Sequence, residues 1–572
     1  MREPSARHPE LSSKEAHEGN GQRRLAPHDA FGLERHRPQA VITLLEDGRW
    51  HPIAELVAAT GVSREGVLHV VSQLGAERRG ASVRLILSPP SPSLQSTRAA
   101  ARPLRPLIVR EAVSGPARTS AVKAIEADRA GLPSSRRSLD HVRATPETVA
   151  RRVGFLDTHY DLDGATIVCL GDNDLTSLAV ARQASSARVI VVDIDERILG
   201  HIDRVARAQN LRIELYSADL RLGLPRSVQG RANIVLTDPP YTTRGVSLFA
   251  DRAVGCLDRQ WGRVVLCHGY GEGNPAAGER VQEALSRLHL LIEALIPGFN
   301  SYQGAQAIGS RSDLYILRPT TRAWRRIDRG APRVTDARVY SRGVSSEESS
   351  VAELPTVVIN TALNAAAALG PAAPRIIGDG WPANLVTEPS LSAFLFSPTK
   401  VRTLVPNATP VILSLAPSFG SSLRRTLLHG VWRPLVVVVS REAVSREEIE
   451  NGGTSHDLLR SATNIKVLDP GDENNAVLVV QPSEAPTDDL LFVLRYLVAH
   501  PEATVTNAWR EGLIACAHLR GRDLTKNEAR TLVEATGSLD LFAPARLADL
   551  PACRINQLVA GVRSTLSGAG QL

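Results

Sequence analysis

The sequence predicts an α/β protein, with a small helical domain before the main sheet and a second α/β region, ending in helices, after it. Two observations carry this fold class. Across residues 164–318, apolar runs of strand length alternate with helical stretches, which is typical of a mostly parallel sheet with helices on both faces. Linker-like stretches separate this region from a compact, mainly helical pattern before it and from a second α/β stretch after it, so each part is assigned its own structure.

The composition fits a chain of several globular domains. Its 572 residues are 43% apolar, which is enough for roughly two to four domains. No apolar run is long enough to cross a membrane, and the first 37 residues lack the apolar core of a secretory signal. The five Cys are scattered and form no CxxC pair. We therefore expect a reduced, cytoplasmic protein without a cysteine-based zinc site.

Residues 1–37 are predicted to be a disordered tail, and residues 38–88 a winged helix. The second segment has the order helix, short helix, helix and hairpin, with its last strand in VRLIL. Winged helices often place the third helix in the major groove of DNA. The exposed positions of that helix are of mixed character here: Arg64, Glu65, His69 and Gln73. Because the whole chain carries a net charge of only +7, packing or dimerisation is favoured over nucleic-acid binding.

Composition sets the remaining boundaries. Residues 89–118 are rich in Pro, Ser and Arg and are predicted to be a linker. Residues 119–325 are assigned to a catalytic domain, residues 326–354 to a second linker and residues 355–572 to a C-terminal domain of unknown function. The strands predicted in the catalytic domain are TIVCLGD, RVIVVDID, IELYSAD, ANIVLTDPP, GRVVLCHG, LIEALIPGF and SDLYILRP, of which the last two suit an antiparallel edge pair.

Four successive strands of the catalytic domain end in acidic residues. In a doubly wound sheet, ligands bind beyond the carboxyl ends of the strands, where the strand order reverses. Burying carboxylates there is costly unless a cation or a hydrogen-bond donor compensates for it. The acids, in strand order, are Asp172 and Asp174, then Asp193 and Asp195, then Asp219, then Asp238. The pattern predicts a site for a ligand that carries hydroxyl groups and positive charge.

The positions of these acids favour an adenosine sulfonium compound as the cofactor. An acid at the end of the second strand accepts hydrogen bonds from ribose hydroxyls, and either Asp193 or Asp195 suits this role. Asp219, after the third strand, is expected near the adenine amino group. The first strand ends in Gly171 and the acidic sequence DND instead of a G-x-G-x-x-G phosphate cradle. A pyrophosphate would be repelled there, so S-adenosylmethionine or a relative is favoured over NAD and FAD.

The fourth strand is predicted to carry the chemistry. In TDPPYTTRG, Asp238 stands before two prolines and Tyr241, and the prolines stiffen the loop. Asp238 can position an amine and accept its proton as the amine attacks the carbon beside the sulfonium. Tyr241 can stack on a cation or line the slot. His268 and Tyr270, which follow the fifth strand, are further candidates for the pocket. We predict no metal, because no His or Cys cluster has metal-ligand spacing.

Together with the upstream segment LDHVRATPETVARRVGFL, the motifs GDNDLTSLAVA, VVDIDERIL and TDPPYTTRGVSLFADRAVGCL resemble the branched-chain polyamine synthases, the N4-bis(aminopropyl)spermidine synthases. The resemblance covers about residues 38–320. It implies a winged helix before a Rossmann-like, class I methyltransferase-type domain. It also implies aminopropyl transfer from decarboxylated S-adenosylmethionine to spermidine or a related polyamine.

For aminopropyl transfer we expect Gly171, Asp193, Asp195 and Asp219 to hold the donor. We expect Asp172 and Asp174 to lie at the acceptor amines and Asp238 to accept the proton of the attacking amine. The chain departs from the family's Gly-Asp-Asp-Asp motif at Asn173.

Tyr241 leaves two other functions open. Asp-Pro-Pro-Tyr looks like the motif of amino-methyltransferases, so an S-adenosylmethionine-dependent N-methyltransferase is the first alternative, with DNA presented by the winged helix. Arg244 would then suit a phosphate contact. The second alternative is a winged-helix regulator with an inactive Rossmann-like domain, which the intact Asp238 argues against.

The C-terminal domain offers fewer signals. Its predicted strands are TVVIN, RIIGDGW, PVILSLAP, PLVVVVS, IKVLDP and NAVLVVQ, and the pattern turns helical from about residue 488. The sequence GDGW at 378–381 is similar to GDND at 171–174. We therefore keep open a degenerate second Rossmann-like unit, used for dimerisation, for substrate gating or for an unrelated activity.

Overall fold

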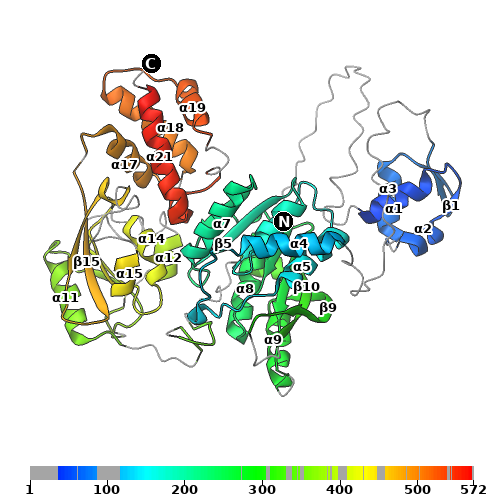
Figure 1. Ribbon diagram of the computed structural model, residues 1–572, viewed down its shortest axis with the longest axis horizontal. Helices are drawn as coiled ribbons and strands as arrows, with labels where there is room; N and C mark the ends of the chain where they lie inside the picture. The colour runs from blue at the N-terminus through cyan, green and yellow to red at the C-terminus, as the bar shows by residue number, and fades with distance from the viewer. Residues whose placement is uncertain are drawn as a thin grey trace, which may run out of the picture. The chain divides into compact units, whose positions relative to one another are not determined.

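The computed structural model (Figure 1) describes most of the chain after residue 35. The described residues are 36–60, 62, 64–86, 116–271, 274–304, 310–329, 338–343, 345–347, 353–382, 384–386, 390–396, 409–428, 431–446, 458–484, 486–501, 503–537, 542 and 544–569. Residues 1–35 of the predicted tail and most of the predicted first linker lie outside them, while residues 36 and 37, also predicted as tail, begin a helix. The chain divides into two compact units, 1–103 and 104–572, and each is described by itself.

The first unit contains three helices and a small antiparallel sheet with strand order β1-β3-β2. Its core is formed by side chains from all three helices and from β3, including Val41, Leu45, Leu56, Val67 and Val83, each at most 1% exposed. Its elements are α1 (His36–Leu45), β1 (His51–Pro52), α2 (Ile53–Thr60), α3 (Arg64–Gln73), β2 (Glu77–Arg79) and β3 (Ser82–Arg84).

The second unit is built first around a seven-stranded sheet of order β6-β5-β4-β7-β8-β10-β9. Five strands are parallel, and β10 lies antiparallel between β8 and β9. This is a Rossmann-like sheet of the methyltransferase type, and its strand order reverses between β4 and β7. The strands are β4 (Thr166–Leu170), β5 (Arg188–Asp193), β6 (Ile213–Ser217), β7 (Ile234–Thr237), β8 (Arg263–His268), β9 (Leu290–Ser301) and β10 (Arg311–Pro319).

Helices flank this sheet (Figure 1). Helix α5 begins at a Thr-Pro pair: the Thr145 hydroxyl accepts a hydrogen bond from the backbone N–H of Thr148, and Pro146 occupies the first helical position. The helical elements are α4 (Pro116–Asp128), η3 (Arg137–Leu139), α5 (Pro146–His159), α6 (Thr176–Gln183), α7 (Glu196–Ala208), α8 (Thr243–Cys256), α9 (Pro275–Arg287) and α10 (Thr321–Asp328).

A second, five-stranded sheet follows, with order β11-β12-β13-β15-β14, and a helical region completes the chain. The strands are β11 (Arg375–Gly378), β12 (Val411–Ser414), β13 (Leu435–Ser440), β14 (Thr463–Leu468) and β15 (Asn475–Pro482). The helical elements are α11 (Thr356–Ala367), α12 (Leu391–Phe396), η5 (Gly420–Ser422), α14 (Leu423–Leu428), α15 (Arg441–Arg446), α17 (Asp489–Ala499), α18 (Val505–Leu519), α19 (Lys526–Ala535), η7 (Leu547–Asp549) and α21 (Ala552–Ala569).

One predicted strand of this region was wrong. The segment TVVIN begins helix α11 instead. Its β-branched residues favour a strand locally, but the chain continues with Ala-rich sequence, and Val358, Ala362 and Ala366 bury one helical face at a spacing of four residues. Packing of that face against the second sheet outweighs the local preference of the first five residues.

The predicted second linker also contains packed structure. Helix α10 runs into it, and Val339 and Tyr340 are buried against Leu248 of α8. The Thr242 hydroxyl donates a 2.6 Å hydrogen bond to the Val339 carbonyl, which ties this strap to the loop after β7. The strap, residues 338–347 without residue 344, therefore packs on the domain of the seven-stranded sheet.

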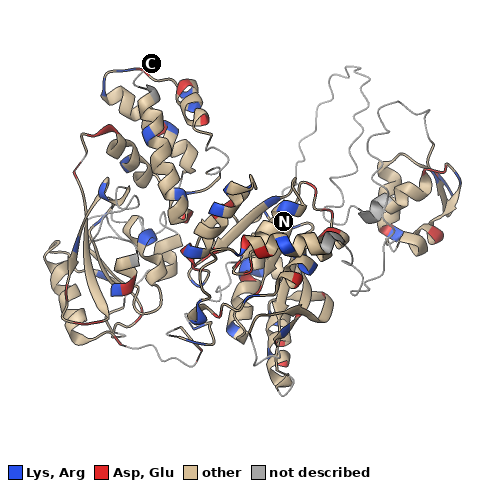
Figure 2. Ribbon diagram, viewed as in Figure 1, with Lys and Arg blue, Asp and Glu red and all other residues tan. Residues whose placement is uncertain are grey.

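Basic and acidic side chains are interspersed along the described helices (Figure 2). Helix α3 carries Arg64 and Glu65 side by side in its first turn. Within the described part of the chain, no helix is long and apolar enough to cross a bilayer.

Candidate active site

A pocket lies at the carboxyl ends of β4, β5, β6 and β7, where the strand order reverses. This is where a doubly wound sheet is expected to bind its ligand. The pocket is lined by one or more acids from each strand end: Asp172, Asp174, Asp193, Asp219 and Asp238. Among the residues that the structure describes, no group of His, Cys, Asp and Glu side chains is arranged to hold a metal ion.

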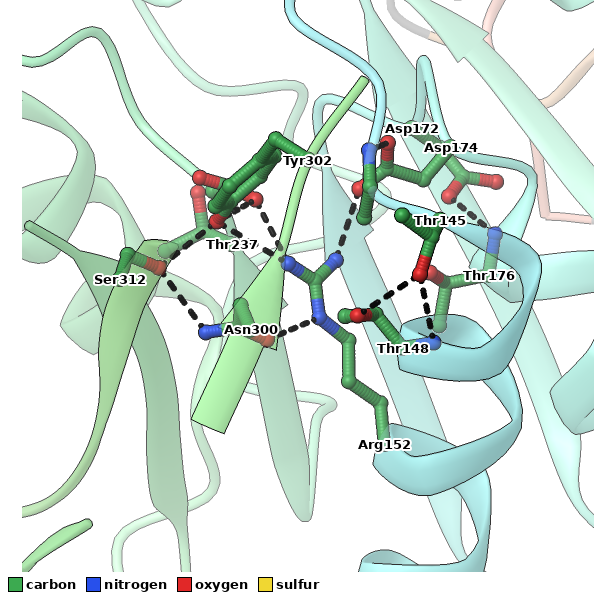
Figure 3. A network of polar contacts seen from close by, with 12 residues as sticks. Thr145, Thr148, Arg152, Asp172, Asp174, Thr176, Thr237, Asn300, Tyr302 and Ser312 are labelled. Atoms are coloured by element: carbon green, nitrogen blue, oxygen red, sulfur yellow. Dashed lines mark hydrogen bonds and ion pairs between the residues drawn. The ribbon is translucent and has the colours of Figure 1, made fainter. Parts of the chain in front are cut away.

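Arg152 of helix α5 lies inside this acidic cluster (Figure 3). Its guanidinium donates to Asp174 Oδ2 and to Asp238 Oδ2, each at 2.7 Å, and to Asn300 Oδ1 of β9 at 2.8 Å. The Arg152 side chain is 1% exposed. A buried arginine is stable only when its donors are paired, and here carboxylates from two different strand ends share it.

The carboxylate of Asp238 accepts hydrogen bonds from three side chains of the protein. Tyr302 donates to Oδ2 at 2.8 Å and Tyr241 to Oδ1 at 3.2 Å, while Arg152 also binds Oδ2. Burial raises the pKa of Asp238 to about 6, although Arg152 opposes this shift. The Asp238 side chain keeps 15% of its surface exposed. It is therefore ionised at neutral pH, accessible, and close to the range in which a carboxylate exchanges protons.

The two acids after β4 have different surroundings. Asp172 caps helix α6, because Oδ1 accepts from the backbone N–H of Thr176 at 2.8 Å. Burial nevertheless raises the pKa of Asp172 to about 8. Asp174 accepts from the backbone N–H of Ala144 at 2.6 Å and from Arg152. Both line the pocket. At neutral pH Asp172 is mostly protonated in the absence of a cation, whereas Asp174 already shares its charge with Arg152.

Asn173 stands between these acids and also lines the pocket. Both polar atoms of its side chain are buried, and neither has a hydrogen-bond partner among the described residues. Buried amides are normally satisfied. Asn173 therefore has one donor and one acceptor available to a bound molecule.

The geometry distinguishes between the two acids after β5. Asp193 lines the pocket and accepts from the backbone N–H of Asp172 at 2.9 Å. Asp195 does not line it; its carboxylate caps α7 and binds Arg197 at 2.5 Å. The side chain that faces a ligand at this strand end is thus Asp193, and Asp195 supports the helix behind it.

Asp219 is held by Arg221. Arg221 Nη2 lies 2.6 Å from Asp219 Oδ2, and the two side chains are almost fully buried. Tyr340 of the strap stacks near the guanidinium, with its ring centroid 5.5 Å from Arg221 Cζ. Asp219, Arg221 and Tyr340 all line the pocket. The acid predicted near an adenine thus shares its charge with a neighbouring arginine.

The remaining candidates lie outside this pocket. His268 packs against the ring of Tyr241, with ring centroids 5.7 Å apart, and burial lowers its pKa to about 4. Tyr270 is 37% exposed, with its ring against Gly278. The backbone N–H of Arg244 donates to Glu347 Oε1 at 3.2 Å.

Sequence reasoning missed the residues that organise the site. Arg152, Asn300 and Tyr302 were not singled out, although Arg152 lies in one of the quoted motifs. A signal was available: four acidic strand ends require a buried cation, and an arginine on the helix before the first strand is close enough to supply it. Nothing in the sequence pattern indicated that β9 would bring Asn300 and Tyr302 to the same place.

The model of the branched-chain polyamine synthase A C-terminal domain matches residues 120–349. An N(4)-bis(aminopropyl)spermidine synthase of Thermococcus kodakarensis is 30% identical over 187 residues, which are 32% of this chain and 51% of that protein. One from Thermus thermophilus is 32% identical over 30% of this chain and 50% of that protein. An uncharacterized protein of Methanocaldococcus jannaschii is 35% identical over 30% of this chain and 44% of that protein.

Solved structures also resemble parts of this chain. The branched-chain polyamine synthase C9 mutein of Thermus thermophilus, in complex with N4-aminopropylspermidine and 5'-methylthioadenosine, is 22% identical, with a TM-score of 0.33; the match covers 50% of this chain and 87% of that one. A putative RNA methyltransferase of Pyrococcus horikoshii is 14% identical, with a TM-score of 0.29, over 36% of this chain and 98% of that one.

The chain spans about half the length of the curated relatives that it matches. The matched segment contains the whole acidic pocket together with Arg152, Tyr302 and the strap. Residues 120–349 of this chain are thus similar to the branched-chain polyamine synthase A C-terminal domain.

Proposed function

We propose that this protein transfers an aminopropyl group from decarboxylated S-adenosylmethionine to an amine of spermidine or a related polyamine. The observation that carries the proposal is the acidic pocket around Asp238 within a segment of the branched-chain polyamine synthase family. Relatives of this segment are named N(4)-bis(aminopropyl)spermidine synthases. Carboxylates at the strand ends suit a cationic donor and a polycationic acceptor, both of which need opposite charge when they leave water.

In the proposed reaction the neutral acceptor amine attacks the aminopropyl carbon attached to sulfur. A carbon–nitrogen bond forms, the carbon–sulfur bond breaks, and its electron pair remains on the sulfur of 5'-methylthioadenosine. The nitrogen becomes cationic and loses a proton. Asp238 is the proposed acceptor of that proton, because it is accessible, ionised at neutral pH and held by Tyr241, Tyr302 and Arg152.

The other pocket acids are proposed to bind the substrates. Asp193 would accept hydrogen bonds from the ribose, since it faces the pocket at the end of the second strand. Asp219, with Arg221 beside it, lies at the adenine end. Asp172 and Asp174 are the proposed contacts for the acceptor amines. Asn173 would bind as a neutral group, which weakens the hold on a polycation relative to a third carboxylate.

Transfer of a methyl group to an amine is the second candidate, and the surroundings of Asp238 favour it in one respect. Tyr241 presents an aromatic ring beside the acid, as a site for a planar amine needs, and Arg152 already neutralises part of the negative charge. In this case the N-terminal unit, which we propose to be a winged helix, would present the substrate.

The test measures both binding and product. Decarboxylated and intact S-adenosylmethionine are titrated into the protein by calorimetry, each with and without spermidine. The same mixtures are then analysed by mass spectrometry, with Asp238→Asn as the control. Preference for the decarboxylated donor, strengthened by spermidine, together with an aminopropylated product, supports the proposal. Preference for the intact donor, independent of spermidine, contradicts it and directs the search to methyl acceptors.

A further inference from the structure

The second sheet repeats most of the catalytic sheet. Strands β4-β7-β8-β10-β9 and β11-β12-β13-β15-β14 have the same layout. In each, three parallel strands are followed by an antiparallel one, which pairs in antiparallel fashion with the edge strand. In each, a helix beginning near a proline precedes the first strand: α5 at Pro146 and α11 after Pro355. Five strands in the same order and directions are unlike a chance arrangement.

The register of the two sheets agrees as well. In the first sheet Thr237 lies opposite Leu266, Leu266 opposite Tyr315, and Tyr315 opposite Leu295. In the second sheet the corresponding row of opposite residues is Ser414, Val438, Val477 and Leu468. Thr237 and Ser414 are both the last residue of their strand. Each first strand also leads to a glycine of positive φ followed by Asp, at Gly171 and at Gly378. Here the register differs by one residue, because Leu170 lies opposite Thr237 whereas Gly378 itself lies opposite Ser414.

The repeat lacks what the reaction needs. Asp238 follows Thr237, whereas the buried Leu415 follows Ser414. No described strand pairs with the outer edge of β11, where β5 and the ribose-binding acid would stand. The second sheet therefore resembles a shortened copy of the first sheet and lacks a counterpart of Asp238. Its carboxyl-end loop, residues 415–421, has no part in the proposed reaction and can serve a different function.

That loop contacts the donor end of the pocket through Arg221. Besides Asp219, the guanidinium of Arg221 binds the carbonyl oxygen of Ser418 at 2.6 Å and Ser345 Oγ of the strap at 2.7 Å. The Phe419 ring centroid lies 4.7 Å from Arg221 Cζ, within cation–π range. Arg221 is thus held on one side by the catalytic domain and the strap, and on the other by the repeat.

Asp379, which follows Gly378 at the end of β11, is exposed and has a weaker electrostatic effect on Arg221 than Asp219 has. Burial opposes the charge of Arg221, but the carboxylates of Asp219 and Asp379 raise its pKa. The carboxyl ends of both sheets therefore act on the same arginine. Asp219 and Tyr340, which Arg221 holds, line the pocket.

We propose that the truncated repeat supports the donor pocket from behind its lining: loop 415–421 binds Arg221, and Arg221 positions Asp219 and Tyr340 for the nucleoside of the donor. Arg221 is a positioning residue in this arrangement. The part of this inference that names the ligand as a nucleoside rests on the proposed function. The part that couples the repeat to the pocket rests only on the contacts of Arg221 with Ser418 and Phe419.

The test compares two buried phenylalanines of the C-terminal domain. Phe419→Ala removes the ring over Arg221, whereas the control, Phe542→Ala, removes a ring that packs on Trp509. Hydrogen exchange is measured over 217–224 and 338–343, and binding of 5'-methylthioadenosine by calorimetry. We expect Phe419→Ala to raise exchange in both segments and to weaken binding by about tenfold, the scale of one lost cation–π contact. We expect Phe542→Ala to lower the melting temperature without either effect.

Asp379→Asn, which keeps its shape, is the milder variant and should shift binding in the same direction by about threefold. Equal behaviour of the two alanine variants, or unchanged exchange and binding in Phe419→Ala and Asp379→Asn, would overturn the inference. If the unmodified protein binds no 5'-methylthioadenosine, aminopropyl transfer fails as the function. The exchange comparison then still decides whether the repeat holds the pocket.

Discussion

Arg152 and Asp238 form a buried ion pair of 2.7 Å although they lie 86 residues apart in the chain. The arginine comes from the helix before the sheet, and the acid from the loop after β7. The same arginine binds Asp174 after β4. The geometry around Asp238 therefore depends on how α5 packs across the strand ends, and not on the Asp-Pro-Pro-Tyr loop alone.

Replacing Arg152 by Met is expected to lower the free energy of unfolding by about 3–5 kcal/mol, because two buried carboxylates lose their cation. Urea unfolding at neutral pH measures this. Arg151→Met is the matched control, since Arg151 donates hydrogen bonds to the Phe299 carbonyl and the Thr148 hydroxyl. This variant should lower the free energy of unfolding by about 1 kcal/mol. Equal costs for both variants would show that Arg152 is not the cation on which the cluster depends.

Asp238→Asn should lower kcat by about 10²- to 10⁴-fold, the range for loss of a general base. In the unmodified enzyme kcat/KM should rise through pH 6, because Asp238 has a pKa of about 6 and accepts a proton only when it is ionised. The rate of 5'-methylthioadenosine release between pH 5 and 8 measures this. A flat profile, or unchanged kcat in the Asp238→Asn variant, would remove Asp238 from the mechanism.

Tyr302→Phe is expected to move the acidic limb of the same profile to higher pH. The Tyr302 hydroxyl donates to the ionised carboxylate at 2.8 Å and therefore favours the charged form. Tyr241→Phe removes a longer contact of 3.2 Å and keeps the ring, so its shift should be smaller. The two pH profiles are compared directly. We predict that the acidic limb moves further in Tyr302→Phe than in Tyr241→Phe. A larger movement in Tyr241→Phe contradicts this prediction.

Asn173→Asp restores a third carboxylate beside Asp172 and Asp174. If the acceptor is a polycation, KM for spermidine should fall by roughly 3- to 10-fold at low salt, because a partly buried ion pair contributes about 1 kcal/mol. Stability should fall as well, since like charges then lie together. Steady-state kinetics at two salt concentrations measures the effect. An unchanged KM for spermidine would place the polyamine away from this loop.

Asp172→Asn should remove a pH-dependent loss of stability. Burial raises the pKa of Asp172 in the folded protein to about 8. The contribution of Asp172 to the free energy of unfolding is therefore highest below about pH 4 and falls as the pH rises to 8, because the folded state disfavours the ionised carboxylate. Asn keeps a cap acceptor for the Thr176 N–H. The gain in stability of the variant over the unmodified protein should grow with pH and reach a few kcal/mol, on the order that such a shift implies. Urea unfolding at pH 4, 6 and 8 tests the trend, and a constant difference contradicts it.

The sequence by itself determined the central sheet and the acidic rim. Alternating apolar runs set the strands and helices, and parallel strands necessarily bring their carboxyl ends to one edge. Asp172, Asp193, Asp219 and Asp238 were therefore predictable as neighbours, and the family resemblance was predictable from the motifs around them.

Tertiary structure decided what each acid does. Whether Asp193 or Asp195 faces the pocket depends on which carboxylate the start of α7 captures. Arg152 and Tyr302 reach Asp238 only because α5 and β9 pack on the strand ends. The segment after Pro355 became a helix because its buried face packs on the second sheet. The capping of α7 by Asp195 is local, since it joins Asp195 to Arg197. For Arg152, Tyr302 and helix α11 the deciding interaction joins residues far apart in the chain, and local sequence patterns do not reveal such contacts.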